Sequence, residues 1–290
     1  MKTAFVTDSA ACFNMDYFAA ENIFSLPLQI SVNDKNYFDL EQLSVAEALA
    51  FMKEDAWMTT SQPALGLIDA LFDKLKEEGF ERVVAVPITS GISGTINAMY
   101  VAGQNAGIPV TCIDCYTTAY YQKEIVEYLS RCEKAGMDLD AEIAYVKSEI
   151  ASDTCNTFVI PRDLKTIRRS GRLTPAAYHI ANLLGIKPLL AINHRSNGRI
   201  DILQKVRTFP RTLQRALEVM QQEIDPSRHY LIAVTHIDNF ADAEIFADKV
   251  RRIFPNAEVF TAPLCTPVAV HVGIGGICIQ YFPRFNKNED

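Results

Sequence analysis

Residues 83–95 read VVAVPITSGISGT, and this stretch decides the fold prediction. Residues 83–86 are apolar and mostly β-branched, which indicates a buried strand over Arg82–Pro87. The small polar turn that follows leads into a segment from Thr95 to Asn105 that we expect to be a helix. A buried strand, a tight turn and a helix form the repeating unit of a parallel sheet, whose strand ends are the usual place for a ligand.

The same alternation of β-rich runs and helical patterns continues around this stretch. Strands are expected at 3–7, 26–32 and 110–113, and helices at 14–21, 63–78 and 119–135. The pattern predicts an α/β domain with a parallel sheet.

After about residue 155 the pattern changes. The turn Asn197-Gly198 separates β-rich runs at 189–192 and 199–206, which predicts a hairpin. Further strands are expected at 157–160, 230–235, 258–261 and 277–282, and helices at 140–152, 175–184, 210–223 and 240–254. The fold class is therefore α/β with two domains, an α/β domain at residues 1–155 and an α+β domain with a mixed sheet at residues 156–290.

Composition excludes several classes of protein. Lys plus Arg number 28 and Asp plus Glu number 35, and the net charge of −7 opposes nucleic acid binding. Seven scattered cysteines do not resemble a disulfide framework, so we expect a reducing compartment, the cytoplasm. The stretch 259–283 lacks charged residues, but its prolines and glycines favour two strands and a loop over a membrane-spanning helix.

Two clusters of hydroxyl residues precede predicted helices. The turn at 89–94 exposes hydroxyls and backbone N–H groups at a helix start, which stabilises an anion without Lys or Arg. A plain helix cap is the alternative, as is a catalytic serine at Ser93, although the G-x-S-x-G pattern is incomplete. The segment TTSQP at 59–63 is either another N-cap or a place where Thr60 or Ser61 shares an anionic ligand with Ser93.

Basic and imidazole side chains supply further candidates. The segment IRRSGRLTP at 167–175 is either a solvated basic turn or a grip on a phosphate or an acidic partner, with Thr174 as the cap of the next helix. His271 lies in an apolar run beside glycines and is either a core histidine or a base. The single Cys112-x-x-Cys115 and the spacing of the histidines do not indicate a metal site. The sequence also lacks a nucleotide-binding glycine loop, so we expect no cofactor.

Eight short motifs are spread along nearly the whole chain. In order they are Thr7-Asp8-Ser9, Thr60-Ser61-Gln62-Pro63, Ser90-Gly91-Ile92-Ser93-Gly94-Thr95, Ile113-Asp114, Ser170-Gly171-Arg172, Ile186-Lys187-Pro188-Leu189-Leu190, Lys205-Val206-Arg207-Thr208 and His271-Val272-Gly273. Together they resemble the DegV family of bacterial fatty acid-binding proteins. The departures are Ala64, Cys115, Ser170 and Ile274, where the family commonly has other residues.

The resemblance implies a long-chain fatty acid ligand with its carboxylate held by hydroxyls. Thr60, Ser61, Ser93 and Gly94 match head-group positions, and His271 matches the histidine beside them. Arg172 and Arg207 match basic positions that face a separate ATP-dependent fatty acid kinase in some members. The alternatives are a serine hydrolase or acyltransferase that uses Ser93 as nucleophile and His271 as base, and a DNA-binding regulator, which the acidic balance opposes.

Overall fold

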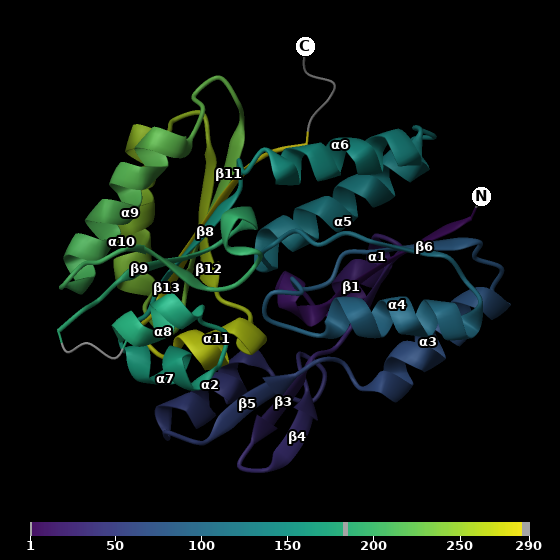
Figure 1. Ribbon diagram of the computed structural model, residues 1–290, viewed down its shortest axis with the longest axis horizontal. Coiled ribbons are helices and arrows are strands. Elements are labelled where there is room, and N and C mark those ends of the chain that lie inside the picture. Colours follow the sequence, from purple (N-terminus) through teal and green to yellow (C-terminus); the bar gives the residue numbers. More distant parts are fainter. Residues whose placement is uncertain (1, 182–184, 286–290) are drawn as a thin grey trace.

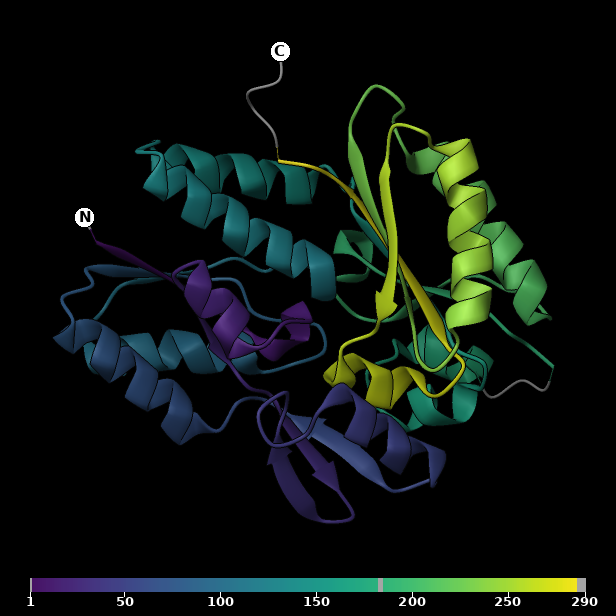
Figure 2. The same cartoon turned by 180° about the vertical axis from the view of Figure 1, so that it is seen from behind.

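The computed structural model describes residues 2–181 and 185–285, which form three β-sheets (Figures 1 and 2). The first sheet has four parallel strands in the order β2-β1-β6-β7. Their bounds are β1 Thr3–Asp8, β2 Ile23–Leu26, β6 Arg82–Ala85 and β7 Val110–Cys112. The predicted parallel sheet in the N-terminal part is confirmed.

Alternating side chains of this sheet bury both of its faces. Phe5 and Val84 share one core with the helix α5, whereas Ala4 and Val83 belong to another core with α3 and α4. The period of two that a strand imposes therefore holds on both faces. The helices of this part are α1 Met15–Ala20, α3 Leu65–Glu77, α4 Thr95–Ala106, α5 Ala119–Lys134 and α6 Leu139–Ala151.

The second sheet has six strands in the order β10-β9-β8-β13-β11-β12. It is mixed as predicted, because β11 pairs parallel with β12 and the other pairs are antiparallel. Its strands are β8 Asn156–Ile160, β9 Leu189–Ile192, β10 Asp201–Gln204, β11 Tyr230–His236, β12 Glu258–Pro263 and β13 Ile277–Pro283. Helices α9 Phe209–Glu223 and α10 Phe240–Ile253 cover one face, as Figure 2 shows.

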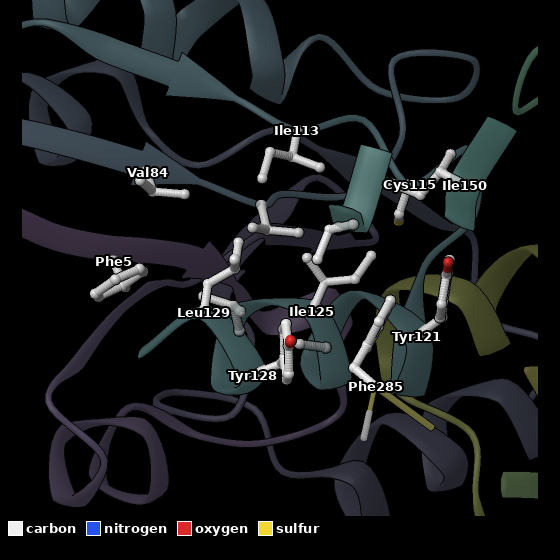
Figure 3. Close-up of a cluster of buried hydrophobic side chains, with 14 of the residues drawn as sticks. Phe5, Val84, Ile113, Cys115, Tyr121, Ile125, Tyr128, Leu129, Ile150 and Phe285 are labelled. Atoms are coloured by element: carbon white, nitrogen blue, oxygen red, sulfur yellow. The ribbon is translucent and has the colours of Figure 1, made fainter. Parts of the chain in front are cut away.

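Helix α5 packs against both large sheets. The core around Ile125 includes Phe5 from the first sheet and Ala233 and Phe282 from the second, and Figure 3 shows Phe5 on its strand and Phe285 beside the helix. The strands of the first sheet precede residue 155 and those of the second follow it. The division into two domains at residue 155 stays a prediction, and the core is common to both parts.

A third sheet and several short helices were not predicted. Its antiparallel strands, in the order β4-β3-β5, are β3 Gln29–Val32, β4 Lys35–Phe38 and β5 Met58–Ser61. Thr60 and Ser61 thus lie on a strand, and the N-cap alternative for this segment is wrong, because α3 begins at Leu65 with Ala64 as its cap. The helices missed by the sequence analysis are α2 Val45–Lys53, α7 Leu164–Arg169 and α11 Thr266–Val272.

Two segments differ in detail from their predictions. The uncharged stretch 259–283 contains the expected strands, but α11 lies between them instead of a loop. Within the residues described above, no helix has the length and apolar character needed to cross a bilayer. The helix expected at 175–184 is found as α8 Pro175–Ala181, capped by Thr174 as predicted, and residues 182–184 lie outside the described part of the chain.

Two carboxyl groups are buried close to the end of β1. Asp8 accepts hydrogen bonds from the backbone N–H groups of Ala10 and Ile88 and from Gln122, yet burial raises its pKa to about 6. Asp39 is 1% exposed and neither of its oxygens has a hydrogen-bond partner in the described residues. Burial raises the pKa of Asp39 to about 7, and the negative charge of Asp8 acts in the same direction.

These raised pKa values predict that stability falls with pH. Between about pH 4 and pH 7 the folded chain holds protons that the unfolded chain has lost, so the free energy of unfolding decreases as pH rises through this window. Asp39→Asn, which removes the charge and keeps the shape, is expected to stabilise the protein by about 2 kcal/mol more at pH 8 than at pH 5. Urea unfolding of both proteins at the two pH values measures this difference. The same difference at both pH values would contradict a protonated Asp39.

Candidate functional site

A cavity of about 380 Å³ lies over the face of the six-stranded sheet opposite to α9 and α10. Its floor comes from alternate residues of β8, β13, β11 and β9, and its sides come from α11, β5 and the turn before α4. The volume is in the range of small-molecule sites, which are mostly apolar with a few placed polar groups. The apolar lining includes Ile88, Ile92, Val159, Ile192, Leu264 and Val268.

The predicted head-group residues line this one cavity. Thr60, Ser61, Ser93, Gly94 and His271 all contribute to its wall. Thr60 comes from β5, where it is paired opposite Ile30 of β3, and its Oγ1 lies 2.7 Å from Nε2 of His271 on α11. The convergence of the two hydroxyl clusters, which the spacing alone left open, is therefore present in the fold.

The turn before α4 contributes a hydroxyl and a helix start. Ser93 Oγ lies 2.8 Å from Thr95 Oγ1 and accepts a hydrogen bond from Thr95 N–H. Gly94 is the N-cap of α4, and a Cβ atom there would lie 2.7 Å from Oε1 of Gln62, so glycine permits the close contact between the two clusters. The positive end of this helix at the cavity wall favours an anionic ligand.

His271 is a neutral side chain at the cavity wall. Burial lowers its pKa to about 3, and the positive charge of Arg172 acts in the same direction. A neutral imidazole donates one hydrogen bond and accepts one, so it can bridge Thr60 and a ligand oxygen. The nucleophile–base pair of the hydrolase alternative is not formed, because His271 bonds to Thr60 and Ser93 bonds to Thr95.

Arg172 lines the same cavity, although the resemblance assigns it to a partner. It is half-buried, and its guanidinium donates to the backbone carbonyl of Ser170. In the described part of the chain no carboxylate lies within 4.0 Å of it, whereas Arg284 pairs with Glu124 and Glu258. A buried cation without a counter-ion is costly, so this end of the cavity is suited to an anion.

The head-group end also adjoins an outer hollow. His271 and Arg172 line this second space of about 320 Å³, together with Trp57, Lys165 and Arg169. The two side chains therefore stand between the cavity and the outer hollow. Arg207, by contrast, is exposed and lies outside both.

The sequence analysis missed the floor of the cavity. Thr157 on β8 and Gln280 on β13 are register partners, and Thr235 on β11 pairs with Cys278 of β13. The four residues line the cavity and alternate with apolar residues that face α9 and α10. Polar residues inside otherwise apolar strands were the available signal.

Comparison with known proteins identifies relatives over the whole chain. The profile described as "Uncharacterised protein, DegV family" matches residues 2–284. A DegV domain-containing protein of Halalkalibacterium halodurans is 31% identical over 283 residues, covering 97% of this chain and 98% of the relative.

Solved structures with the same fold include two described as fatty acid binding. DegV from Bacillus subtilis, described as a fatty acid binding protein, has a TM-score of 0.86 and 24% identity, covering 97% of this chain and 99% of that one. A fatty acid binding DegV family protein from Streptococcus agalactiae has a TM-score of 0.86 and 26% identity, covering 98% of this chain and 99% of that one. The likeness extends over both large sheets.

Proposed function

The chain belongs to the DegV family, and from this membership and the cavity we propose that it binds a long-chain fatty acid. The carboxylate lies at Thr60, Ser93, His271 and Arg172, and the tail fills the apolar part. One observation carries the proposal: Arg172, half-buried and without an acidic partner among the described residues, opens onto an apolar cavity. That combination matches an amphiphile with a single negative charge.

The energetics agree with this ligand class. Burial of about fifteen methylene groups at about 0.8 kcal/mol each gives roughly 12 kcal/mol of gross transfer free energy before the cost of ordering. Removing the carboxylate from water opposes binding, and hydroxyl, imidazole and guanidinium donors offset this cost. The tail therefore supplies affinity and the head group fixes orientation.

A binding role, without catalysis, fits the geometry. A hydrolase would need the hydroxyl of Ser93 within hydrogen-bond reach of a base. Here the hydroxyl of Ser93 forms a hydrogen bond with Thr95, and His271 forms one with Thr60. The descriptions of the two solved relatives likewise name fatty acid binding.

Extraction of the purified protein tests the proposal. Denaturing extraction with organic solvent, followed by mass spectrometry against a buffer control, is expected to release stoichiometric fatty acid. An empty protein that also fails to take up added saturated and unsaturated acids would contradict the proposal.

We further propose that the chain presents its ligand to a separate ATP-dependent fatty acid kinase in the cytoplasm. All seven cysteines are free thiols, which supports a reducing compartment. Arg207 is exposed and outside the cavity, so it is available to a partner. Arg207→Glu is expected to lower acyl phosphate formation by such a kinase several-fold while fatty acid affinity stays unchanged. Unchanged acyl phosphate formation would remove Arg207 from this role.

A further inference from the structure

The cavity floor is polar where it meets the start of α5. Thr157 and Val159 lie on the same face of β8, and Val159 shares a core with Val272 of α11. Thr157 lies two residues earlier in the strand, beside Gln280 and the residues just before α5. The polar atoms of Thr157 and Gln280 therefore lie in a part of the floor that is distant from α11, the helix that bears His271.

Hydrogen bonds fix the orientation of the Gln280 amide. Its Oε1 accepts from the N–H of Tyr121 at 2.9 Å. Its Nε2 donates to the carbonyl of Thr118 at 2.8 Å and to Oγ1 of Thr157 at 2.7 Å, with Oγ1 of Thr117 at 3.3 Å. Thr157 consequently accepts one hydrogen bond from this amide.

The hydroxyl groups of Thr117 and Thr157 have one proton more than their mutual hydrogen bond uses. The hydroxyls of Thr117 and Thr157 lie 2.7 Å apart, so one of their two protons forms the bond between them. The other proton has no acceptor among the described residues. The hydroxyl of Thr118 reaches Ala10 O and Gln122 Oε1, and that of Thr235 donates to Cys278 O.

Thr157 is the member of this pair that can use the spare proton. Thr157 lines the cavity and Thr117 does not. When Thr117 donates to Thr157, both lone pairs of Thr157 Oγ1 are occupied and its own proton is directed elsewhere. Thr157 then offers the ligand a hydrogen-bond donor and no acceptor.

We propose that this donor recognises a carbonyl oxygen within the acyl chain, so that the cavity prefers an oxo-fatty acid. The proposal rests on the proposed function and names its ligand more narrowly. A ketone accepts a hydrogen bond without bringing a proton that needs an acceptor, whereas a hydroxyl brings one. An unsubstituted tail leaves the buried donor unpaired, which reduces its affinity.

Octadecanoic acids with an oxo group at successive positions provide the test. Against wild-type protein, at least one positional isomer is expected to bind roughly five- to thirty-fold more tightly than octadecanoic acid, and more tightly than the hydroxy acid with the same position. The carbonyl stretch of that bound isomer is expected at a lower wavenumber than in an apolar solvent. If no isomer exceeds octadecanoic acid, the proposal is wrong.

Variants locate the effect. Thr157→Val is expected to remove the preference for the oxo acid, and Thr157→Ser to retain it. Thr235→Val is the matched control, because its hydroxyl lines the same cavity but already donates to a carbonyl. A preference that survives in Thr157→Val would overturn the assignment, and the wild-type series decides the question if this variant does not fold. Failure of octadecanoic acid itself to bind would instead contradict the proposed function.

Discussion

Replacement of Arg172 by methionine is expected to weaken binding of a long-chain fatty acid by roughly thirty-fold or more and to leave binding of the corresponding fatty alcohol nearly unchanged. The guanidinium lines the head-group end of the cavity and has no carboxylate partner in the described chain. The ligand carboxylate is therefore its counter-ion in the proposed complex. Removal of the guanidinium leaves that carboxylate partly buried without a cation.

Displacement of a fluorescent fatty acid by the acid and by the alcohol measures both affinities. Arg207→Met is the matched control, since it removes an exposed arginine outside the cavity and should change neither. The unliganded Arg172→Met protein should be at least as stable as the wild type, because the variant lacks a half-buried cation that has no carboxylate partner among the described residues. An equal loss for acid and alcohol would show that Arg172 acts through packing alone.

Gly91→Val is expected to lower the free energy of unfolding by about 3 kcal/mol and to weaken fatty acid binding. A Cβ atom at Gly91 would lie 2.3 Å from the backbone carbonyl of Gly198 in the β9–β10 hairpin. Backbone atoms cannot turn aside as a side chain can, so the turn that carries Ser93 must move away from the hairpin.

Gly66→Ala is the control for this change. A Cβ atom at Gly66 meets nothing within 4 Å, and the residue lies inside α3, where alanine is favoured over glycine. Urea unfolding should therefore show a small stabilisation for Gly66→Ala and a large loss for Gly91→Val. A loss below about 1 kcal/mol for Gly91→Val would contradict a rigid contact between turn and hairpin.

Periodicity predicted the elements that bury a regular apolar pattern. The parallel strands β1, β6 and β7, the long helices and the hairpin at Asn197-Gly198 were all of this kind. The single strand expected at 26–32 is wrong, because this segment holds the end of β2 and all of β3, which lie in different sheets. It failed for β5 and α11, because β5 is short and half-polar and α11 contains Pro267 within an uncharged run. Their pairing and packing come from distant segments, β3 and β5 respectively, which a local pattern does not contain.

The role of the basic turn was equally hidden from local spacing. Arg168 lies over the ring of Tyr178 and Arg169 over that of Trp57, whereas Arg172 reaches the cavity. The three arginines stand within five residues of one another in the sequence. Which of them meets a ligand depends on the surrounding fold, and the sequence supplied only their number.

The shared packing of α5 restricts how this molecule can be inherited or rebuilt. The helix belongs to the first part of the chain, yet Leu231, Ala233 and Phe282 of the second part complete its core. A fragment that ended at residue 155 would expose one side of that core to water, and the remaining fragment would expose the other. Exchanging one half for that of a distant relative would pair two core surfaces whose residues had not evolved together. The two halves are therefore expected to vary together in evolution.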